Sequence, residues 1–249
     1  MKVSIITPVY NASRFIEDTA KSVFEQSYSD WEWILVDDCS TDNSWEILQC
    51  LEKKDHRVKI YKNPTNVKQG KTRNFAITQA SGKYIAFLDS DDIWHNDKLK
   101  VQIKFMQDND YYFTHTSAGY LDEDGNRIKS TFHVSPVVDY EHLLKSTEIL
   151  CLTVVYDAEK IGKYYMPEYD TREDYVLWLS ILKDGINSYG IDEELAYYRL
   201  VKGSHSSKKS KLILTHIKLL KETQGLNTIQ ALYYTGHWMI RGFIKYFIK

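Results

Sequence analysis

The chain has 249 residues, of which 43% are hydrophobic and 27% are charged, a composition typical of a globular protein with one sizeable core. Its net charge of −2 is unevenly distributed: residues 200–249 contain nine Lys or Arg and one acid, a balance of +8 that leaves −10 on residues 1–199. An acidic body argues against nucleic acid as the main partner, whereas a basic tail with aromatic residues suits an anionic membrane surface.

Three cysteines, Cys39, Cys50 and Cys151, form no CxxC pair and no dense framework, which fits free thiols in a reducing compartment. The apolar run at the N-terminus is too short for a signal peptide and better fits a first strand. No uninterrupted run of about 18 apolar residues is present, so no transmembrane span is expected. We therefore expect a cytoplasmic protein.

Strand and helix signals alternate through the first half of the chain. They predict strands over 3–9, 31–36 and 58–61 and from Tyr84 onward, helices capped by Ser13 and by Ser40 or Thr41, and a helix over 71–79. This order predicts a parallel α/β sheet with helices on both faces.

Beyond residue 110 the signals no longer alternate. They predict, in order, a hairpin of 111–121 and 127–132 around Asp124-Gly125, a helix over 139–146, an extended segment over 150–156, a helix over 172–182 and an extended segment over 195–200. We expect this mixed second half to complete the same sheet.

The chain is predicted to be helical from Ser210 onward. His237, Arg241, Lys245 and Lys249 recur every four residues and form a polar stripe on an otherwise apolar helix. Such a helix could lie in a bilayer interface with its cations on lipid headgroups, or pack against the body of the protein or a second subunit. Acidic residues are absent from the sequence after Glu222, which favours the membrane.

Polar and acidic residues follow several predicted strands. They are Thr7 and Tyr10 after the first, Asp37 and Asp38 after the second, and Asp89, Asp91 and Asp92 after the fourth. The carboxyl ends of parallel strands meet at one rim, where ligands bind in open α/β sheets. Three neighbouring carboxylates need a countercharge, which Mg²⁺ or Mn²⁺ would supply; alternatively, they form a solvated turn that caps a helix beginning near His95.

Five motifs occur in a specific order: Thr7-Pro8-Val9-Tyr10-Asn11, Val36 to Asp42, Asn66 to Arg73, Leu88 to Asp92, and Arg172 to Tyr175. Together they resemble the motifs of family 2 glycosyltransferases with the GT-A fold, a Rossmann-like, mostly parallel sheet flanked by helices. The resemblance covers residues 1–205 and implies a nucleotide-binding half, 1–110, and an acceptor-binding half, 111–205. Residues 206–249, the basic amphipathic tail, match no motif.

The resemblance implies that the first half binds a UDP-sugar. The residues expected at the nucleotide and its diphosphate are Thr7, Pro8, Val9, Tyr10, Asp38, Asn66, Gly70, Arg73, Asp89, Ser90, Asp91 and Arg199. Asp38 would accept a hydrogen bond from the uracil N–H, although an Asx-type turn is an alternative. Arg73 would contact the diphosphate or else be a surface arginine, and Arg199 would offer bidentate hydrogen bonds to phosphate.

Asp89-Ser90-Asp91 matches the DxD motif of the family. The resemblance implies that Asp91, with Asp89, ligates a Mn²⁺ or Mg²⁺ ion that bridges the diphosphate and neutralises the departing UDP. His205 is a candidate third ligand, although a lone loop histidine is more often exposed and without such a role.

Glu173 and Asp174 begin a predicted helix, where acids also stabilise the helix dipole. In the family, the second acid of this pair is the catalytic base. The resemblance therefore implies that Asp174 deprotonates the acceptor hydroxyl, and that Glu173 binds the acceptor or supports Asp174.

The resemblance implies an inverting glycosyltransferase. We expect it to be non-processive, because the QxxRW signature and the membrane spans of processive family members are absent from the sequence. It would move a hexose or N-acetylhexosamine from a UDP-sugar to a polyprenyl-diphosphate-linked saccharide in capsule, O-antigen or exopolysaccharide assembly. We expect a peripheral protein at the inner face of the cell membrane, with a homodimer as a possible state. One alternative is a nucleotidyltransferase, which would need a triphosphate-binding loop that Thr7 to Asn11 do not provide. The other is a non-catalytic, membrane-associated interaction protein.

Overall fold

The computed structural model describes residues 1–169, 171–201 and 209–247. Within these residues the strands are β1 (Val3–Val9), β2 (Trp31–Asp37), β3 (Val58–Lys62), β4 (Tyr84–Phe87), β5 (Ile93–Trp94), β6 (Phe113–Leu121), β7 (Val137–Val138), β8 (Val155–Asp157) and β9 (Ser188–Arg199). The helices are α1 (Ile16–Phe24), α2 (Ser44–Lys54), α3 (Gln69–Gln79), α4 (Lys98–Asn109), α5 (Tyr140–Leu144), the 3₁₀ helix η1 (Cys151–Thr153), α6 (Ala158–Ile161), α7 (Glu173–Lys183), α8 (Lys209–Gln224) and α9 (Thr228–Phe247).

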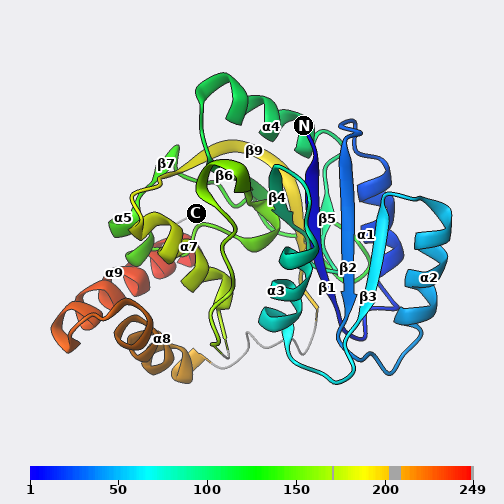
Figure 1. Ribbon diagram of the computed structural model, residues 1–249. Helices are drawn as coiled ribbons and strands as arrows, with labels where there is room; N and C mark the ends of the chain where they lie inside the picture. The colour runs from blue at the N-terminus through cyan, green and yellow to red at the C-terminus, as the bar shows by residue number, and fades with distance from the viewer. Residues whose placement is uncertain (170, 202–208, 248–249) are drawn as a thin grey trace.

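One mixed sheet runs through the molecule in the order β3-β2-β1-β4-β8-β6-β9-β5, with β7 paired to β9 (Figure 1). Its first half is parallel, since β1 pairs in parallel with β2 and β4, and β2 with β3. In the second half β8 runs antiparallel to β4 and β6, whereas β9 runs parallel to β6 and antiparallel to β5 and β7. The prediction that the second half completes the same sheet is confirmed.

Helices cover both faces of the sheet because successive side chains of each strand point to opposite faces. On β2, Trp33 and Leu35 belong to a buried cluster that also includes residues of α1, α2 and α4. Ile34 and Val36 belong to a second cluster on the other face, which extends to residues of α3, α5, α7 and the C-terminal helices. Trp178 of α7 lies in the second cluster, with its ring centroid 5.4 Å from that of Phe87 on β4. The two layers leave the carboxyl edge of the parallel strands free for the loops of the predicted site.

A buried carboxylate, Glu32 of β2, joins neighbouring strands at the opposite, amino edge of the sheet. Its oxygens accept hydrogen bonds from the hydroxyls of Ser4 and Ser81 (2.7 and 2.8 Å) and form ion pairs with Lys2 and Lys59 (2.9 and 2.6 Å). Although burial acts in the other direction, hydrogen bonds from these partners lower the pKa of Glu32 well below its usual value. The network stabilises the sheet away from the predicted site.

Two predicted helix caps are wrong. Ser13, expected to cap the first helix, instead donates its N–H to Asp42 (3.0 Å), and α1 has no side-chain cap. Ser40 and Thr41 do not cap α2, because Asp42 accepts the backbone N–H of Ser44 (3.0 Å) at the start of that helix. At α1, which begins three residues after Ser13, the backbone N–H groups of Phe15 and Ile16 donate to the carbonyl of Ala12 (2.9 and 3.0 Å), so a hydroxyl cap from Ser13 is not needed.

Three predicted segments also differ from the structure. The helix expected from His95 begins at Lys98, because the N–H of His95 extends the pairing of β5 with β9 through the carbonyl of Leu195 (2.9 Å). Residues 127–132 make isolated bridges to β6 instead of a hairpin strand. Residues 150–156 include η1 before β8 begins.

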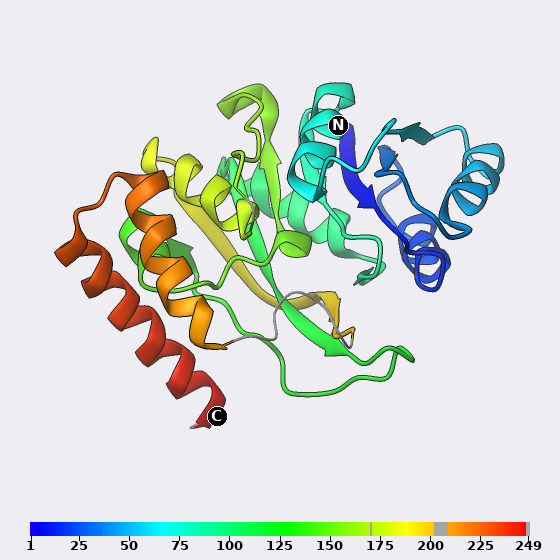
Figure 2. The ribbon, with the colours of Figure 1, turned by 90° about the horizontal axis from the view of Figure 1, so that it is seen from below.

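The tail forms the helices α8 and α9, which lie side by side at the end of the molecule far from β1 (Figure 2). Ala231 and Thr235 of α9 are buried, and Arg241, part of the predicted polar stripe, donates to His142 of α5 (2.8 Å). Of the two arrangements predicted for the tail, packing against the body is therefore observed. Within the described ranges, no helix is both long and apolar enough to span a bilayer.

Candidate active site

Loops from the carboxyl edge of the parallel strands meet at one rim. The side-chain oxygen of Asn11 accepts a hydrogen bond from the backbone N–H of Thr41 (2.8 Å), and the backbone N–H of Asn11 donates to the hydroxyl of Ser40 (3.0 Å). These hydrogen bonds join the loops after β1 and β2. Non-glycine residues with positive φ occur in these loops and immediately before α3 and α7, at Asn11, Cys39, Lys68 and Arg172. Such backbone conformations are unfavourable and tend to gather at functional sites.

In the first-strand motif, Tyr10 offers the accessible side chain. It is 53% exposed, whereas Thr7, Pro8 and Val9 are buried. The Thr7 hydroxyl accepts a hydrogen bond from the indole N–H of Trp33 (2.8 Å). Thr7, Pro8 and Val9 therefore support the rim, and Tyr10 is the predicted nucleotide contact of this motif whose side chain is accessible.

Asp38 is buried and holds the loop that precedes α3. Its carboxylate accepts hydrogen bonds from the side chain of Asn63 (2.8 Å) and from the backbone N–H groups of Val67 and Lys68 (2.9 Å each). The alternative of an Asx-type turn is not observed at Asp38, because the N–H of Ser40 donates to Asp37 (3.2 Å). The predicted uracil contact of Asp38 stays a prediction.

The acids after β4 form a cluster in which Asp92 is buried and Asp89 and Asp91 are half-buried, and not a solvated, helix-capping turn. Asp92 is 1% exposed; one of its oxygens accepts the backbone N–H of Arg199 (2.9 Å), and the other has no partner among the described residues. Burial and the charge of Asp89 raise the pKa of Asp91 to about 6. Burial and the charges of both neighbours raise the pKa of Asp92 well above its usual value. The charged forms of Asp91 and Asp92 are therefore disfavoured in this turn, and a bound cation would favour them.

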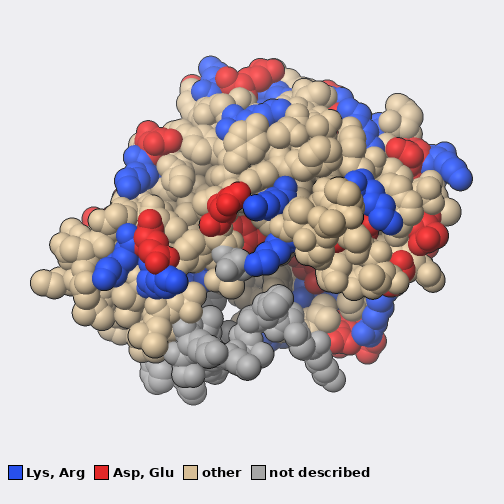
Figure 3. Space-filling model, turned by 60° about the horizontal axis from the view of Figure 1, so that its bottom comes forward, with Lys and Arg blue, Asp and Glu red and all other residues tan. Residues whose placement is uncertain are grey.

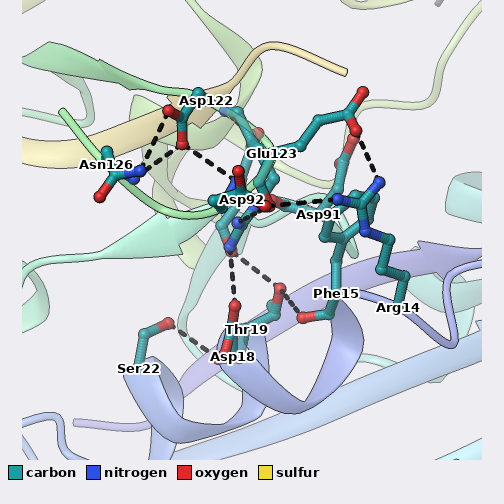
Figure 4. Close-up of polar contacts among 12 residues, drawn as sticks. Arg14, Phe15, Asp18, Thr19, Ser22, Asp91, Asp92, Asp122, Glu123 and Asn126 are labelled. Atoms are coloured by element: carbon teal, nitrogen blue, oxygen red, sulfur yellow. Dashed lines mark hydrogen bonds and ion pairs between the residues drawn. The ribbon is translucent and has the colours of Figure 1, made fainter. Parts of the chain in front are cut away.

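Thr19 of α1 holds the backbone of Asp89 to Asp92, the acidic turn, from below (Figure 4). Its hydroxyl lies within hydrogen-bonding distance of the carbonyl oxygens of Ser90 (3.1 Å) and Asp92 (2.9 Å). Sequence reasoning missed Thr19, because its helical spacing predicts only that it faces the core.

Arg199 holds the same turn from the side of β9. Its guanidinium donates to the carbonyl oxygens of Asp91 (2.8 Å) and Glu123 (3.1 Å) and forms an ion pair with Asp18 (3.1 Å). Figure 4 shows Asp91 and Asp92 between α1 and the loop that carries Glu123. The predicted phosphate contact of Arg199 stays a prediction; in this structure the side chain supports the acidic turn.

Arg73 of α3 joins the acidic turn to the start of α7. Its side chain is 3% exposed, with Nη2 2.5 Å from Asp89 and Nη1 3.0 Å from Glu173. The alternative of a surface arginine is therefore wrong. Gly70 lies one turn earlier on the helix, where an added Cβ would come within 3.2 Å of Cγ of Glu173. The missing side chain at Gly70 allows α3 to approach α7 this closely.

Glu173 and Asp174 begin α7 and are both partly buried. The carboxylate of Asp174 accepts the backbone N–H of Tyr175 (2.7 Å). Burial raises the pKa of both acids, against the opposing effect of the Arg73 charge. A carboxylate with a raised pKa is a better general base near neutral pH than an ordinary one.

The acidic turn has the chemistry of a divalent-cation site. Mg²⁺ and Mn²⁺ prefer carboxylate oxygens, which Asp89 and Asp91 supply. The pKa of Asp91 is raised by burial and by the charge of Asp89, so a cation bound there would favour its charged form. The part of the chain that the structure describes contains no group of three His, Cys, Asp or Glu side chains placed to hold a metal ion. Two carboxylates suffice where substrate phosphates and water complete the shell, as is common for Mg²⁺.

Asn66 and His205 are the remaining predicted residues. The side chain of Asn66 is exposed, and its oxygen accepts the N–H of Lys68 (3.3 Å). His205, the predicted third metal ligand, lies outside the described residues.

Comparison with known proteins identifies the family. Residues 4–157, which include β1 to β8 and the acidic turn, match the family described as "Glycosyl transferase family 2". The chain belongs to glycosyltransferase family 2. The predicted family and enzyme class are thereby confirmed.

Relatives in glycosyltransferase family 2 align with nearly the whole chain. TuaG of Bacillus subtilis (strain 168), a glycosyltransferase proposed for teichuronic acid biosynthesis, is 43% identical over 92% of this chain and 91% of its own length. WfgD of Escherichia coli, named UDP-Glc:alpha-D-GlcNAc-diphosphoundecaprenol beta-1,3-glucosyltransferase, is 37% identical over 98% of this chain and 94% of its own.

The fold is also that of a solved structure. S. aureus TarS 1–349 in complex with UDP-GlcNAc matches with a TM-score of 0.74 and 22% identity, over 98% of this chain and 73% of TarS 1–349. The predicted GT-A fold of this glycosyltransferase is confirmed.

Proposed function

We propose that this glycosyltransferase transfers one hexose or N-acetylhexosamine per encounter from a UDP-sugar to a hydroxyl group of a polyprenyl-diphosphate-linked saccharide, with inversion at the anomeric carbon. The observation that carries the proposal is the pair of contacts that Arg73 makes with Asp89 and Glu173, because they hold Asp89 beside the Glu173–Asp174 pair. A centre that stabilises a departing diphosphate and deprotonates an attacking hydroxyl needs both groups within reach of one pair of substrates.

The names of relatives support the donor and acceptor classes. WfgD is named for a UDP-glucose donor and a diphosphoundecaprenol-linked GlcNAc acceptor, and TarS 1–349 was solved with UDP-GlcNAc. For this chain we assign the nucleotide to the rim formed by Tyr10, Asp38 and Asn66, with Arg199 near the diphosphate.

Asp89 and Asp91 would hold Mn²⁺ or Mg²⁺, which when bound supplies positive charge against the diphosphate as the sugar leaves it. Asp174 accepts the proton of the acceptor hydroxyl while that oxygen forms its bond to the anomeric carbon. The bond between this carbon and the UDP oxygen breaks on the opposite face, so a single displacement inverts the configuration. Arg73, fixed between two acids, keeps Asp89 and Glu173 in place during this step.

Exposed apolar residues on α9 support peripheral contact with an anionic membrane. Ile229 is 80% exposed, and Leu232, Tyr233 and Ile240 are also exposed; Ile229, Tyr233 and Ile240 lie on the side of the helix opposite the buried Ala231. Figure 3 shows charges of both signs beside each other over the end of the molecule that carries α8, where Lys218 pairs with Glu222 (3.8 Å). The apolar stripe, with the basic excess of residues 200–249, would bring the rim to a lipid-linked acceptor.

Release of UDP from a panel of UDP-sugars tests the proposal, with Mn²⁺ and a polyprenyl-diphosphate-linked monosaccharide as acceptor. We expect metal-dependent release from one donor, and loss of release in Asp91→Ala with the protein still folded. A wild-type protein that binds no UDP would contradict the proposal. An Asp91→Ala variant that transfers sugar at the normal rate would contradict the role of the acidic turn.

A further inference from the structure

A cluster of four side chains joins the C-terminal helices to the residue that precedes the Glu173–Asp174 pair. The Arg172 guanidinium donates to Nδ1 of His216 on α8 (3.0 Å). Its Cζ lies 4.5 Å from the ring centroid of Tyr175 and 5.4 Å from that of Trp238 on α9. The rings of His216 and Trp238 stack with centroids 4.6 Å apart. Both C-terminal helices therefore contact one side chain at the start of α7.

The hydrogen bond determines the protonation state of His216. A guanidinium only donates, so Nδ1 is an acceptor and the imidazole is neutral, with its proton on Nε2. His216 is 1% exposed, and burial together with the Arg172 charge lowers its pKa to about 3. Arg172 therefore has a permanent acceptor at neutral pH.

The backbone of Arg172 explains why this restraint matters. Its φ of 59° and ψ of 36° are left-handed, a conformation that residues with a Cβ disfavour. Its carbonyl oxygen accepts the N–H of Val176 (3.1 Å), the hydrogen bond that starts α7. A change of φ at this position would swing the first turn of the helix, which carries Glu173 and Asp174, relative to the fixed Arg73.

We propose that Arg172, His216 and Trp238 are positioning residues for glycosyl transfer: the C-terminal helices lock Arg172 in its left-handed conformation and so orient Asp174 towards the acceptor. The inference rests on the proposed role of Asp174 as the base. It makes α8 and α9 part of the catalytic unit, in addition to any contact they make with a membrane. None of the three residues has to touch the substrates.

Two substitutions at His216 in the 249-residue chain test the positioning role, with a short-chain, detergent-soluble acceptor and no membrane present. His216→Leu keeps the volume and loses the acceptor, whereas His216→Asn places an amide oxygen near the position of Nδ1. We expect kcat of His216→Leu to fall about 10- to 100-fold while Kd for UDP changes less than about twofold, since only the orientation of the base is lost. His216→Asn should recover most of the rate. Lys218→Ala, on the exposed side of α8, is the matched control and should keep wild-type kcat.

A wild-type kcat in His216→Leu would overturn the inference, and so would a loss of UDP affinity equal to the loss of kcat. If melting curves show that His216→Leu does not fold, Trp238→Leu replaces it, because it removes the contact of Arg172 with α9. Trp238→Leu must then show a lower kcat with an unchanged Kd for UDP. Asp174→Asn in the same assay separates the two proposals. An active Asp174→Asn would mean that the base lies elsewhere, whereas an inactive Asp174→Asn beside a normal His216→Leu would reject the positioning role alone.

Discussion

Asp89 and Glu173 contact opposite ends of one guanidinium, that of Arg73. The two amino groups of Arg form a fixed fork, which the point charge of Lys cannot reproduce. We expect Arg73→Lys to lower kcat/KM for sugar transfer about 100-fold, because the two halves of the site are no longer held together. Steady-state kinetics with the preferred UDP-sugar measure the effect.

Lys71→Met is the control for this substitution. Lys71 lies on the same helix, and its ammonium pairs with Glu168 at the surface (3.1 Å), so its loss should leave kcat/KM unchanged. An Arg73→Lys enzyme within about threefold of wild type would show that the bridge is not needed for transfer.

The pKa of Asp91 connects stability with metal binding. A carboxyl group whose pKa rises from 3.8 to about 6 on folding stabilises the folded state below pH 3.8, and this contribution is lost as the pH rises through 6. Without metal, Asp91→Asn should therefore stabilise the protein at pH 7.5 by on the order of 1 to 2 kcal/mol, and much less at pH 4.

Thermal unfolding with and without Mn²⁺ measures this effect. Mn²⁺ should raise Tm of the wild type more at pH 7.5 than at pH 5, since a protonated carboxyl is a poor ligand, and it should not raise Tm of Asp91→Asn. A lower Tm for Asp91→Asn at pH 7.5 without metal would show that the charged form of Asp91 does not destabilise the folded protein.

Among the secondary structure elements, β1 to β4 depend on the Glu32 network at the edge of the sheet opposite the site. Glu32→Gln should lower the free energy of unfolding by about 2 kcal/mol, because it weakens the ion pairs with Lys2 and Lys59 while the activity per folded molecule is unchanged. The pKa of Glu32 is lowered on folding, so the difference is present above pH 4.5 and shrinks as the pH falls below that value.

Urea unfolding of Glu32→Gln beside Glu46→Gln, an exposed acid on α2, makes this comparison. Equal stabilities of the two variants at pH 7 would show that the network contributes nothing.

Elements with strong local signals could be predicted from the sequence, and contacts between distant residues could not. The apolar runs of β1 and β2 and the motif acids that follow the strands are local, so both the parallel half of the sheet and the positions of Asp38 and Asp89 could be predicted. The predicted cap at Ser13 is wrong because α1 begins three residues later, at Ile16, and the N–H of Ser13 donates to Asp42 of another loop. The Arg73–Glu173 contact joins residues 100 positions apart, and no local pattern reports it.

At the scale of the whole molecule, the C-terminal helices have two faces with different roles. One face of α9 packs on the body through Ala231 and Trp238, and the other exposes Ile229 and Ile240. Replacing Ile229 and Ile240 together by Ser should weaken binding to anionic vesicles about 10-fold, through loss of buried apolar area, with little effect on transfer to a detergent-soluble acceptor.

Vesicle sedimentation tests this prediction, with Val137→Ser as the control because Val137 of β7 is an exposed apolar residue elsewhere on the surface. If the double variant sediments as well as the wild type, the exposed stripe of α9 is not the membrane contact.

The most direct test of the proposed active centre is the single-turnover transfer rate of Asp174→Asn, measured with saturating UDP-sugar and Mn²⁺ alongside the Kd for UDP. Asparagine keeps the size of the side chain and cannot take the acceptor proton. We expect Kd within about twofold of the wild-type value and a transfer rate lower by about 1,000-fold. Transfer at the wild-type rate with normal UDP binding would show that Asp174 is not the base, and that the centre joined by Arg73 does not work as proposed.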